Sequence, residues 1–335
     1  MQTQKPLSKD LDMTSAISKP RSNIIQQLIV RFGAISILFV LVIVMALLSP
    51  HYLTLTNIRN ILIQTGTNGL LAAGMTFVIL TGNIDLSVGS MLAFSSVVGA
   101  RFMADGHPII LGILLALVIG GLCGALNGVC VARFSLPAFI VTLATMWLLR
   151  GLSYVYTGAQ AIMGLPKSFR YFANGDIGGI PNVILLLAGV YVVGFFLLTK
   201  TKIGLYIYSI GDNEEAARLS GINIRRYKIL VFTISGVLSA LGGMVYASRL
   251  FSGQPVAGIG YELSAIAAVV IGGTSLSGGV GTLTGTLIGA LFISALTNGL
   301  IILNVSAFWQ QVLMGLVVLA AVFFDQYRKK IGVSA

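Results

Sequence analysis

The feature that most constrains this chain is a series of long apolar segments separated by short polar ones. A helix needs roughly 20 apolar residues to cross a bilayer, and most of these segments reach or approach that length. Their apolar residues run continuously and do not alternate with polar ones, which argues against a membrane β-barrel. We therefore expect an all-α polytopic membrane protein with about ten transmembrane helices, whose apolar cores cover 29–48, 58–80, 88–104, 109–131, 138–157, 182–199, 229–247, 261–272, 282–302 and 308–325.

Composition excludes the other broad classes of protein. Of the 335 residues, 56% are hydrophobic and 9% are charged, whereas soluble domains carry about 25% charged residues. The net charge of +11 could indicate a nucleic-acid partner. However, the bases cluster between the apolar segments, and nothing resembles a nucleic-acid-binding module. We therefore predict lipid, and no nucleic acid, as the surroundings of this chain.

The distribution of lysine and arginine predicts the orientation, because these residues favour the cytoplasmic side of a membrane. With ten spans and a cytoplasmic N-terminus, fifteen of the twenty-one bases fall on the cytoplasmic side. The six that remain for the outer side or the outer half of the membrane are Arg59, Arg101, Arg150, Lys167, Arg170 and Arg249. The C-terminus is then cytoplasmic as well.

The same pattern predicts how the chain is divided. We expect a disordered cytoplasmic tail over 1–24, one transmembrane domain over 25–327 with a cytoplasmic loop at 200–228, and a cytoplasmic tail over 328–335. The first apolar segment lacks a clear cleavage site, so we interpret it as a transmembrane helix and not as a signal peptide.

A polar island at 211–221 interrupts the apolar sequence with three acids and one base. Asp212 or Asn213 can cap the N-terminus of a short helix there, and Gly221 can end it in the left-handed conformation. Glu214 and Arg218 have the i,i+4 spacing of a favourable ion pair.

Ala216, Leu219 and Ser220 give this short helix a small, smooth face that could dock into a groove on another protein. The residues expected to take part are Asp212, Asn213, Glu214, Glu215, Ala216, Ala217, Arg218, Leu219, Ser220 and Gly221.

Two breaks rich in Gly, Ser and Thr interrupt apolar segments and suggest broken helices. The stretches 78–89 and 269–281 share this pattern, and the second follows a segment short enough to be a half-helix or a re-entrant segment. Either they resemble each other by chance, or they are copies that begin at opposite faces and form an inverted repeat, as in several transporters. The candidate break or gate residues are Thr81, Gly82, Asn83, Gly272 and Gly273.

Several polar residues lie inside the apolar segments, where exposure to lipid would be unfavourable. Asp85 either caps the helix that starts at Leu86 or contacts a transported molecule. Arg150 either extends to the outer interface or lines a pathway or docking site, and Glu262 suits a helix N-terminus. The candidate pathway residues are Asn68, Thr76, Asp85, Asn127, Thr145 and Asn298.

The stripes at Gly120, Gly124 and Gly128 and at Gly281, Gly285 and Gly289 permit close helix crossings, which we expect within the subunit. No enzymatic chemistry is predicted: the sequence contains no P-loop, no HExxH or GxSxG motif and no Cys/His cluster. We therefore expect neither catalytic residues nor a metal or other cofactor.

These motifs together resemble the ribose-type permeases of ABC importers. Residues 81–90 look like the TGGIDLSVGS segment of that family, with Asn83 in place of a glycine. Residues 211–222 resemble its cytoplasmic EAA-type loop, and 254–279 resemble its C-terminal half. The resemblance covers residues 25–327.

The resemblance implies a bacterial inner-membrane permease that imports a monosaccharide. It implies a second permease copy, a separate ATPase with two nucleotide-binding domains that docks on 211–221, and a periplasmic sugar-binding protein. Ribose fits best, whereas arabinose, xylose, galactose, allose and autoinducer-2-like sugars remain alternatives. An ion-coupled secondary transporter is the rival mechanism; it would need a titratable carboxylate such as Asp85 or Glu262 in its pathway.

Overall fold

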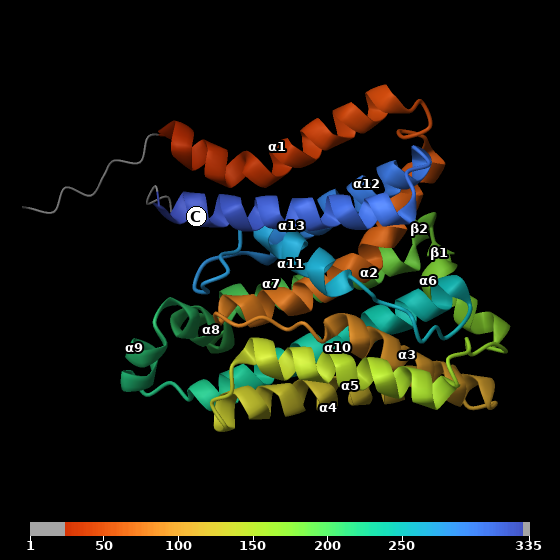
Figure 1. Cartoon of the computed structure of the whole chain (residues 1–335), viewed down its shortest axis with the longest axis horizontal. Coiled ribbons are helices and arrows are strands. Elements are labelled where there is room, and N and C mark those ends of the chain that lie inside the picture. Colours follow the sequence, from red (N-terminus) through yellow and green to blue (C-terminus); the bar gives the residue numbers. More distant parts are fainter. Residues whose placement is uncertain (1–23, 331–335) are drawn as a thin grey trace, which may run out of the picture.

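The computed structural model describes residues 24–330 and shows an almost entirely helical protein (Figure 1). In chain order the elements are α1 (Ile24–Leu48), α2 (Leu55–Leu80), α3 (Val88–Ala104), α4 (Ile109–Arg133), α5 (Ala138–Thr157), a 3-10 turn (Lys167–Phe169), α6 (Arg170–Asn174), β1 (Asp176–Ile177), β2 (Ile180–Pro181), α7 (Asn182–Lys200), α8 (Lys202–Asp212), α9 (Glu214–Leu219), α10 (Ile224–Leu250), α11 (Tyr261–Ile271), α12 (Leu283–Ile302) and α13 (Ala307–Lys330).

The apolar segments of the sequence are helices, which confirms an all-α membrane fold. Within residues 24–330, seven helices are long and apolar enough to span a membrane: α2, α4, α5, α7, α10, α12 and α13. Three shorter apolar helices accompany them, namely Gly33–Leu48 within α1, α3 and α11. With 11 residues, α11 rises about 16 Å, roughly half of a bilayer's hydrocarbon thickness. It is thus the expected half-helix.

Helices α2 and α10 form the centre of the bundle. Every residue of α2 from Thr65 to Leu80 is buried, and the helix packs against α7, α10, α11 and α12. By contrast, α1, α4, α5, α7 and α13 lie outside and expose large apolar side chains, as expected for surfaces that face lipid. Examples are Phe39, Leu126, Val155, Val192 and Phe323.

An inverted arrangement relates two parts of the chain, but not the two stretches that the sequence suggested. Helix α2 runs toward the left in Figure 1, residues 81–87 return extended to the interior, and α3 starts there and runs right. Helix α10 runs right, residues 251–260 return to the interior, and α11 starts there and runs left. Helices α3 and α11 begin side by side, since a Cβ on Gly89 would lie 2.2 Å from the carbonyl oxygen of Gly258, just before α11.

Of the two alternatives for 78–89 and 269–281, the structure therefore excludes copies that begin at opposite faces. Helices α2 and α11 end at the same end of the bundle, where the Gly279 N–H donates to the Leu80 carbonyl oxygen at 3.0 Å. The two breaks lie next to each other because both follow helices that run in the same direction. Their similarity reflects the glycine needed in both turns, where Gly82 and Gly273 have positive φ angles.

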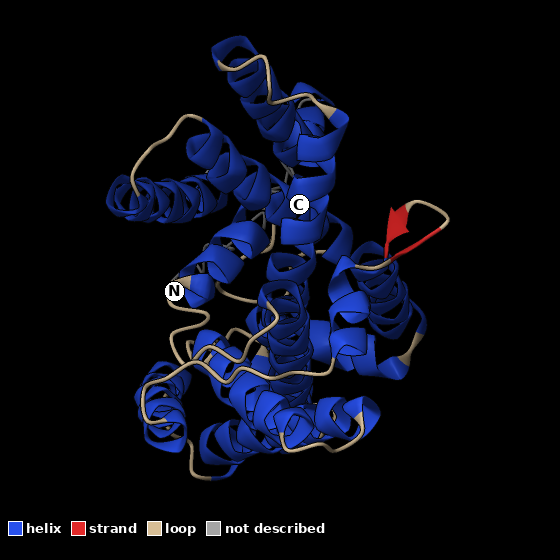
Figure 2. Ribbon diagram, turned by 90° about the vertical axis from the view of Figure 1, so that its right-hand side faces the viewer, coloured by secondary structure: helices blue, strands red, loops and turns tan. Residues whose placement is uncertain are grey.

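The two ends of the bundle carry different structures. Helices α8 and α9 lie at the left-hand end in Figure 1, together with the start of α1 and the end of α13. The short antiparallel hairpin β1–β2 projects from the helical body at the other end (Figure 2), where Arg59 pairs with Asp176 at 3.1 Å. The expected N-terminal tail lies outside the described residues except for Ile24, and α13 continues past the expected boundary at 328 to Lys330.

Candidate functional site

The polar island contains a short helix, α9, which is capped at both ends by local hydrogen bonds. The Asn213 side-chain oxygen accepts from the Ala216 N–H at 2.9 Å, so Asn213 and not Asp212 is the N-cap. At the other end Gly221 has a φ of +82°. Its N–H donates to the carbonyl oxygen of Arg218, and the Ile222 N–H donates to that of Ala217. These two bonds form a Schellman motif, and Gly221 has the left-handed conformation that was expected.

The ion pairs of α9 differ from the expected one. Arg218 pairs with Glu215, one turn away at i,i+3, and this bond lowers the pKa of the Glu215 carboxyl below its usual value. Glu214 instead pairs with Lys228 on α10 at 2.7 Å. Because Lys228 is far along the chain, only the tertiary structure brings it to Glu214. This ion pair links α9 to the N-terminal part of the central helix α10.

Most of α9 is open to solvent, and one of its residues is not. Ala217 is 5% exposed and packs against its own subunit, so it cannot contribute to a docking face. Leu219 is 79% exposed, and Ala216 and Ser220 are exposed beside it. A single exposed leucine is ordinary on a protein surface, so docking of a partner chain on α9 stays a prediction.

Three of the predicted pathway residues meet in one buried hydrogen-bond network. Asp85 is fully buried and accepts from the N–H and hydroxyl of Ser87 and, at 2.9 Å, from the hydroxyl of Ser235. Asn127 donates to the Ser87 hydroxyl at 2.9 Å and accepts from Thr145 at 2.6 Å. Asp85 thus holds the turn that leads into α3, but it is not the N-cap that was predicted: the helix begins at Val88 and not at Leu86, and Ser87 is its N-cap.

The remaining predicted pathway residues lie elsewhere, between α2 and α12. Asn68 donates to Ser294 at 3.1 Å, and the hydroxyls of Thr76 and Thr286 are 2.8 Å apart. Asn298 is also buried on α12, and its side-chain oxygen has no partner among the described residues. The six candidates therefore form two groups, and each group also joins helices within the subunit.

The predicted break residues occupy two tight turns. Gly82 has a φ of +71° and faces the carbonyl oxygen of Ser277, while the Thr81 and Asn83 side chains bond within their own turn. At the other break, a Cβ on Gly272 would lie 2.4 Å from the backbone of Gly285. Both breaks are thus closely packed turns.

The hydrogen bonds of three residues at the candidate site were not predicted from the sequence. Ser87 and Ser235 complete the Asp85 network, although a lone serine in an apolar helix gives no signal of such a role. The guanidinium of Arg150 donates to the carbonyl oxygens of Pro255 and Ala257 at 3.2 and 2.6 Å. It thereby holds the extended segment that precedes α11, whose first turn carries Glu262.

Comparison with known proteins agrees with this architecture. The sequence model of a family described as "Branched-chain amino acid transport system / permease component" matches residues 57–322. The chain is 47% identical over 294 residues to the ribose import permease protein of Haemophilus influenzae, covering 87% of this chain and 91% of that protein. It is 48% identical over 295 residues to the ribose import permease protein of Bacillus subtilis, covering 88% and 91%.

A more distant relative is the L-arabinose ABC transporter permease protein of Azospirillum brasilense, which is 38% identical over 329 residues, covering 98% and 96% of the two chains. No solved structure matches this chain at a significant level. The match over most of the bundle and the high identity to the ribose permeases show that the chain belongs to the permease family of ABC importers, in its ribose-type branch.

Proposed function

We propose that this protein is the membrane-spanning subunit of a bacterial inner-membrane importer that takes up ribose. The observation that supports ribose as the substrate is the 47–48% identity to ribose import permeases over about nine-tenths of their length. The capped helix α9, fastened to α10 by Glu214 and Lys228, supports the rest of the proposal. It offers an exposed, rigid contact for a separate chain that supplies the energy.

Transport proceeds by alternating access, and no bond in the sugar changes. ATP binding closes a partner ATPase with two nucleotide-binding domains, which pushes on α9 in each of two permease copies. The central helices transmit the push and change the side to which the path opens. Two copies enclose this path, and a periplasmic sugar-binding protein delivers the sugar to the end of the bundle that carries the β1–β2 hairpin.

The orientation follows from the position of α9. The start of α1 and the end of α13 lie at the same end of the bundle as α9, which suits cytoplasmic termini (Figure 1). A reporter enzyme that works only in the cytoplasm should therefore be active when it is fused after Ala335. A periplasmic reporter at this position would contradict the orientation.

The polar groups of the Asp85 network and of the α2–α12 contacts are the candidate linings of the path. In this conformation all of them except the half-buried Thr145 are buried between helices of one subunit. We propose that those at the helix breaks reach the path when the half-helices shift. Asn127→Ala should therefore lower the rate of uptake while the permease still associates with its ATPase.

Docking through α9 can be tested by changing the charge of its exposed residues. Glu215→Lys and Leu219→Arg should reduce copurification of the ATPase and the rate of uptake, with membrane insertion intact. Ala217→Arg is a poor probe, because it would place a cation at a buried position. Lys167→Glu, an exposed charge reversal outside α9, is the matched control and should leave ATPase copurification unchanged. Normal uptake by both α9 variants would argue against the docking role.

The substrate and the energy source are tested together in proteoliposomes that contain the permease and its ATPase, supplied with the binding protein. Labelled ribose should enter only with ATP, and an uncoupler should not stop its entry. Preferred uptake of arabinose would instead support the second candidate substrate, which the 38% identical arabinose permease favours. Loss of ribose uptake when the uncoupler is added would support an ion-coupled transporter.

A further inference from the structure

Three segments that are distant in the sequence meet backbone to backbone beside α9. They are the end of α2 with the first break residues (80–82), the end of α8 (211–212), and the loop between α11 and α12 (277–281). We call this contact the glycine joint, because Gly82, Gly211, Gly278 and Gly279 form it.

The distances in the glycine joint leave no room for side chains. A Cβ on Gly211 would lie 1.9 Å from the Leu80 carbonyl oxygen and 2.4 Å from the Gly279 nitrogen. A Cβ on Gly278 would lie 2.7 Å from the Gly82 nitrogen and 2.9 Å from the Gly211 Cα. Real Cβ atoms do not approach other atoms this closely, so the three backbones are in direct contact.

Hydrogen bonds hold the same three segments together. The Gly279 N–H donates to the Leu80 carbonyl oxygen at 3.0 Å, which joins the α11–α12 loop to α2. The Tyr208 hydroxyl donates to the Gly281 carbonyl oxygen at 2.7 Å, which joins the same loop to α8. The glycine joint is therefore bonded as well as packed.

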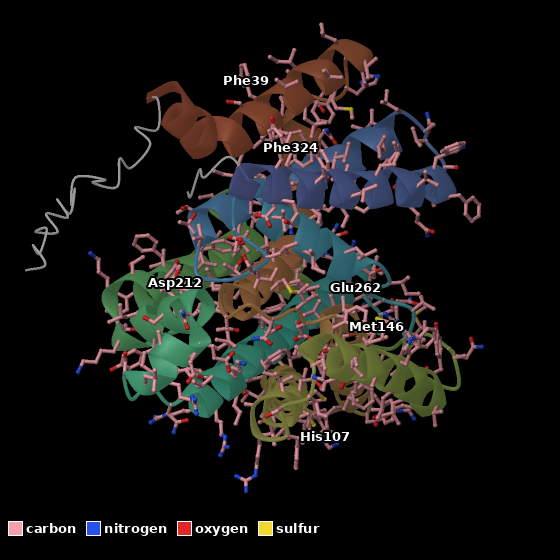
Figure 3. All side chains as sticks on the ribbon, turned by 60° about the vertical axis from the view of Figure 1, so that its left-hand side comes forward. Phe39, His107, Met146, Asp212, Glu262 and Phe324 are labelled. Carbon is pink, nitrogen blue, oxygen red and sulfur yellow. The ribbon has the colours of Figure 1, made fainter. Side chains whose placement is uncertain are left out.

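The position of the joint in the chain gives it a role. Asn213 alone separates α8 from α9. Of the other two segments in the joint, one contains Gly82, which lies in the break before α3. The other contains Gly278 and Gly279, which lie in the break before α12. Figure 3 shows Asp212 at the end of α8, well away from Glu262 at the start of the half-helix α11. The joint thus connects α9 to both breaks.

We propose that the glycine joint transmits the movement of α9 to both broken segments, with Gly211 as its central positioning residue; this rests on the proposed function. A contact between side chains can absorb a small shift by changing rotamers, whereas packed backbones cannot. A displacement of the end of α8 therefore moves the ends of α2 and of the α11–α12 loop together. One docking helix thereby acts on both halves of the inverted arrangement.

The test is Gly211→Ala in the complete transporter, with the number of ATP molecules hydrolysed per sugar taken up as the readout. Gly211 lies in a helix with an ordinary φ, so the substitution acts by its volume alone. An added methyl group needs about 3.4 Å where 1.9 Å is available, so the segments must separate by roughly 1.5 Å. The expected result is unchanged ATPase copurification and a several-fold higher ATP cost per sugar.

The matched control is Gly189→Ala in α7, where a Cβ would meet nothing within 4 Å and transport should stay normal. Tyr208→Phe removes only the hydroxyl that bonds Gly281, and it should raise the ATP cost per sugar by a smaller factor. An unchanged ATP cost per sugar in Gly211→Ala overturns the proposal. If that variant fails to insert, an unchanged cost in Tyr208→Phe overturns it. Absence of ATP-dependent uptake by the unmodified protein would instead refute the proposed function.

Discussion

The close crossing of α4 and α10 predicts that one methyl group at Gly124 destabilises the bundle. A Cβ on Gly124 would lie 2.2 Å from the carbonyl oxygen of Phe232 on α10. Ordinary contact begins near 3.4 Å, so the helices must separate by about 1.2 Å or bend. Gly120 and Gly128 contact the α10 backbone above and below, which leaves little freedom to tilt. Overpacking of this kind costs about 1–3 kcal/mol.

The free energy of unfolding can be measured by titrating the purified protein with SDS in mixed micelles and following its circular dichroism. Gly121→Ala is a matched control on the same helix, because its Cβ would lie 3.1 Å from the methyl end of the Val237 side chain. The Val237 side chain needs to move by only about 0.3 Å, and the higher helix propensity of alanine offsets this cost, so we expect a loss below about 0.5 kcal/mol. Equal losses for Gly124→Ala and Gly121→Ala would refute the reasoning from backbone contact.

Three further predictions follow from the hydrogen bonds and the charges. Asn213→Ala removes the cap of α9 and should cost about 1 kcal/mol of local helix stability, seen as faster amide exchange in α9, whereas Asn213→Asp should retain protection. Ser235→Ala leaves one oxygen of the buried Asp85 carboxyl without its donor and should cost about 1–3 kcal/mol in the SDS titration. Because Arg218 lowers the pKa of Glu215, the stability from this pair is present above the unfolded pKa near 4.3 and is lost as pH falls through the lower folded pKa. Carboxyl NMR should show the Glu215 midpoint rising in Arg218→Gln.

The parts of the fold that depend on neighbouring residues could be predicted from the sequence. Apolar segments of sufficient length must be helical in lipid, because every backbone polar group needs an internal partner. The caps of α9 were predictable for a similar reason, since Asn213 and Gly221 act within a few residues of their own positions. The alternatives Asp212 and Asn213 differed only in geometry, which the structure decided.

Features that depend on distant segments were predicted poorly. The ion pair of Glu214 was assigned to Arg218 because Lys228 is not a neighbour in sequence. Two similar glycine-rich stretches were considered as copies of a repeat, with chance as the alternative, whereas the inverted arrangement relates α2–α3 to α10–α11. Glycine marks a tight turn wherever one occurs, so its pattern does not reveal which turns correspond.

The sequence by itself determined the membrane-protein class, the apolar helices, the caps of the short helix α9 and the family, because each rests on local length, local caps or recognisable motifs. The tertiary structure alone decided that both breaks meet α8 at the glycine joint, that Asp85 is held by Ser235, and that Ala217 faces inward. These features arise where helices cross, and a crossing depends on the shapes of two surfaces that the chain brings together only when it folds.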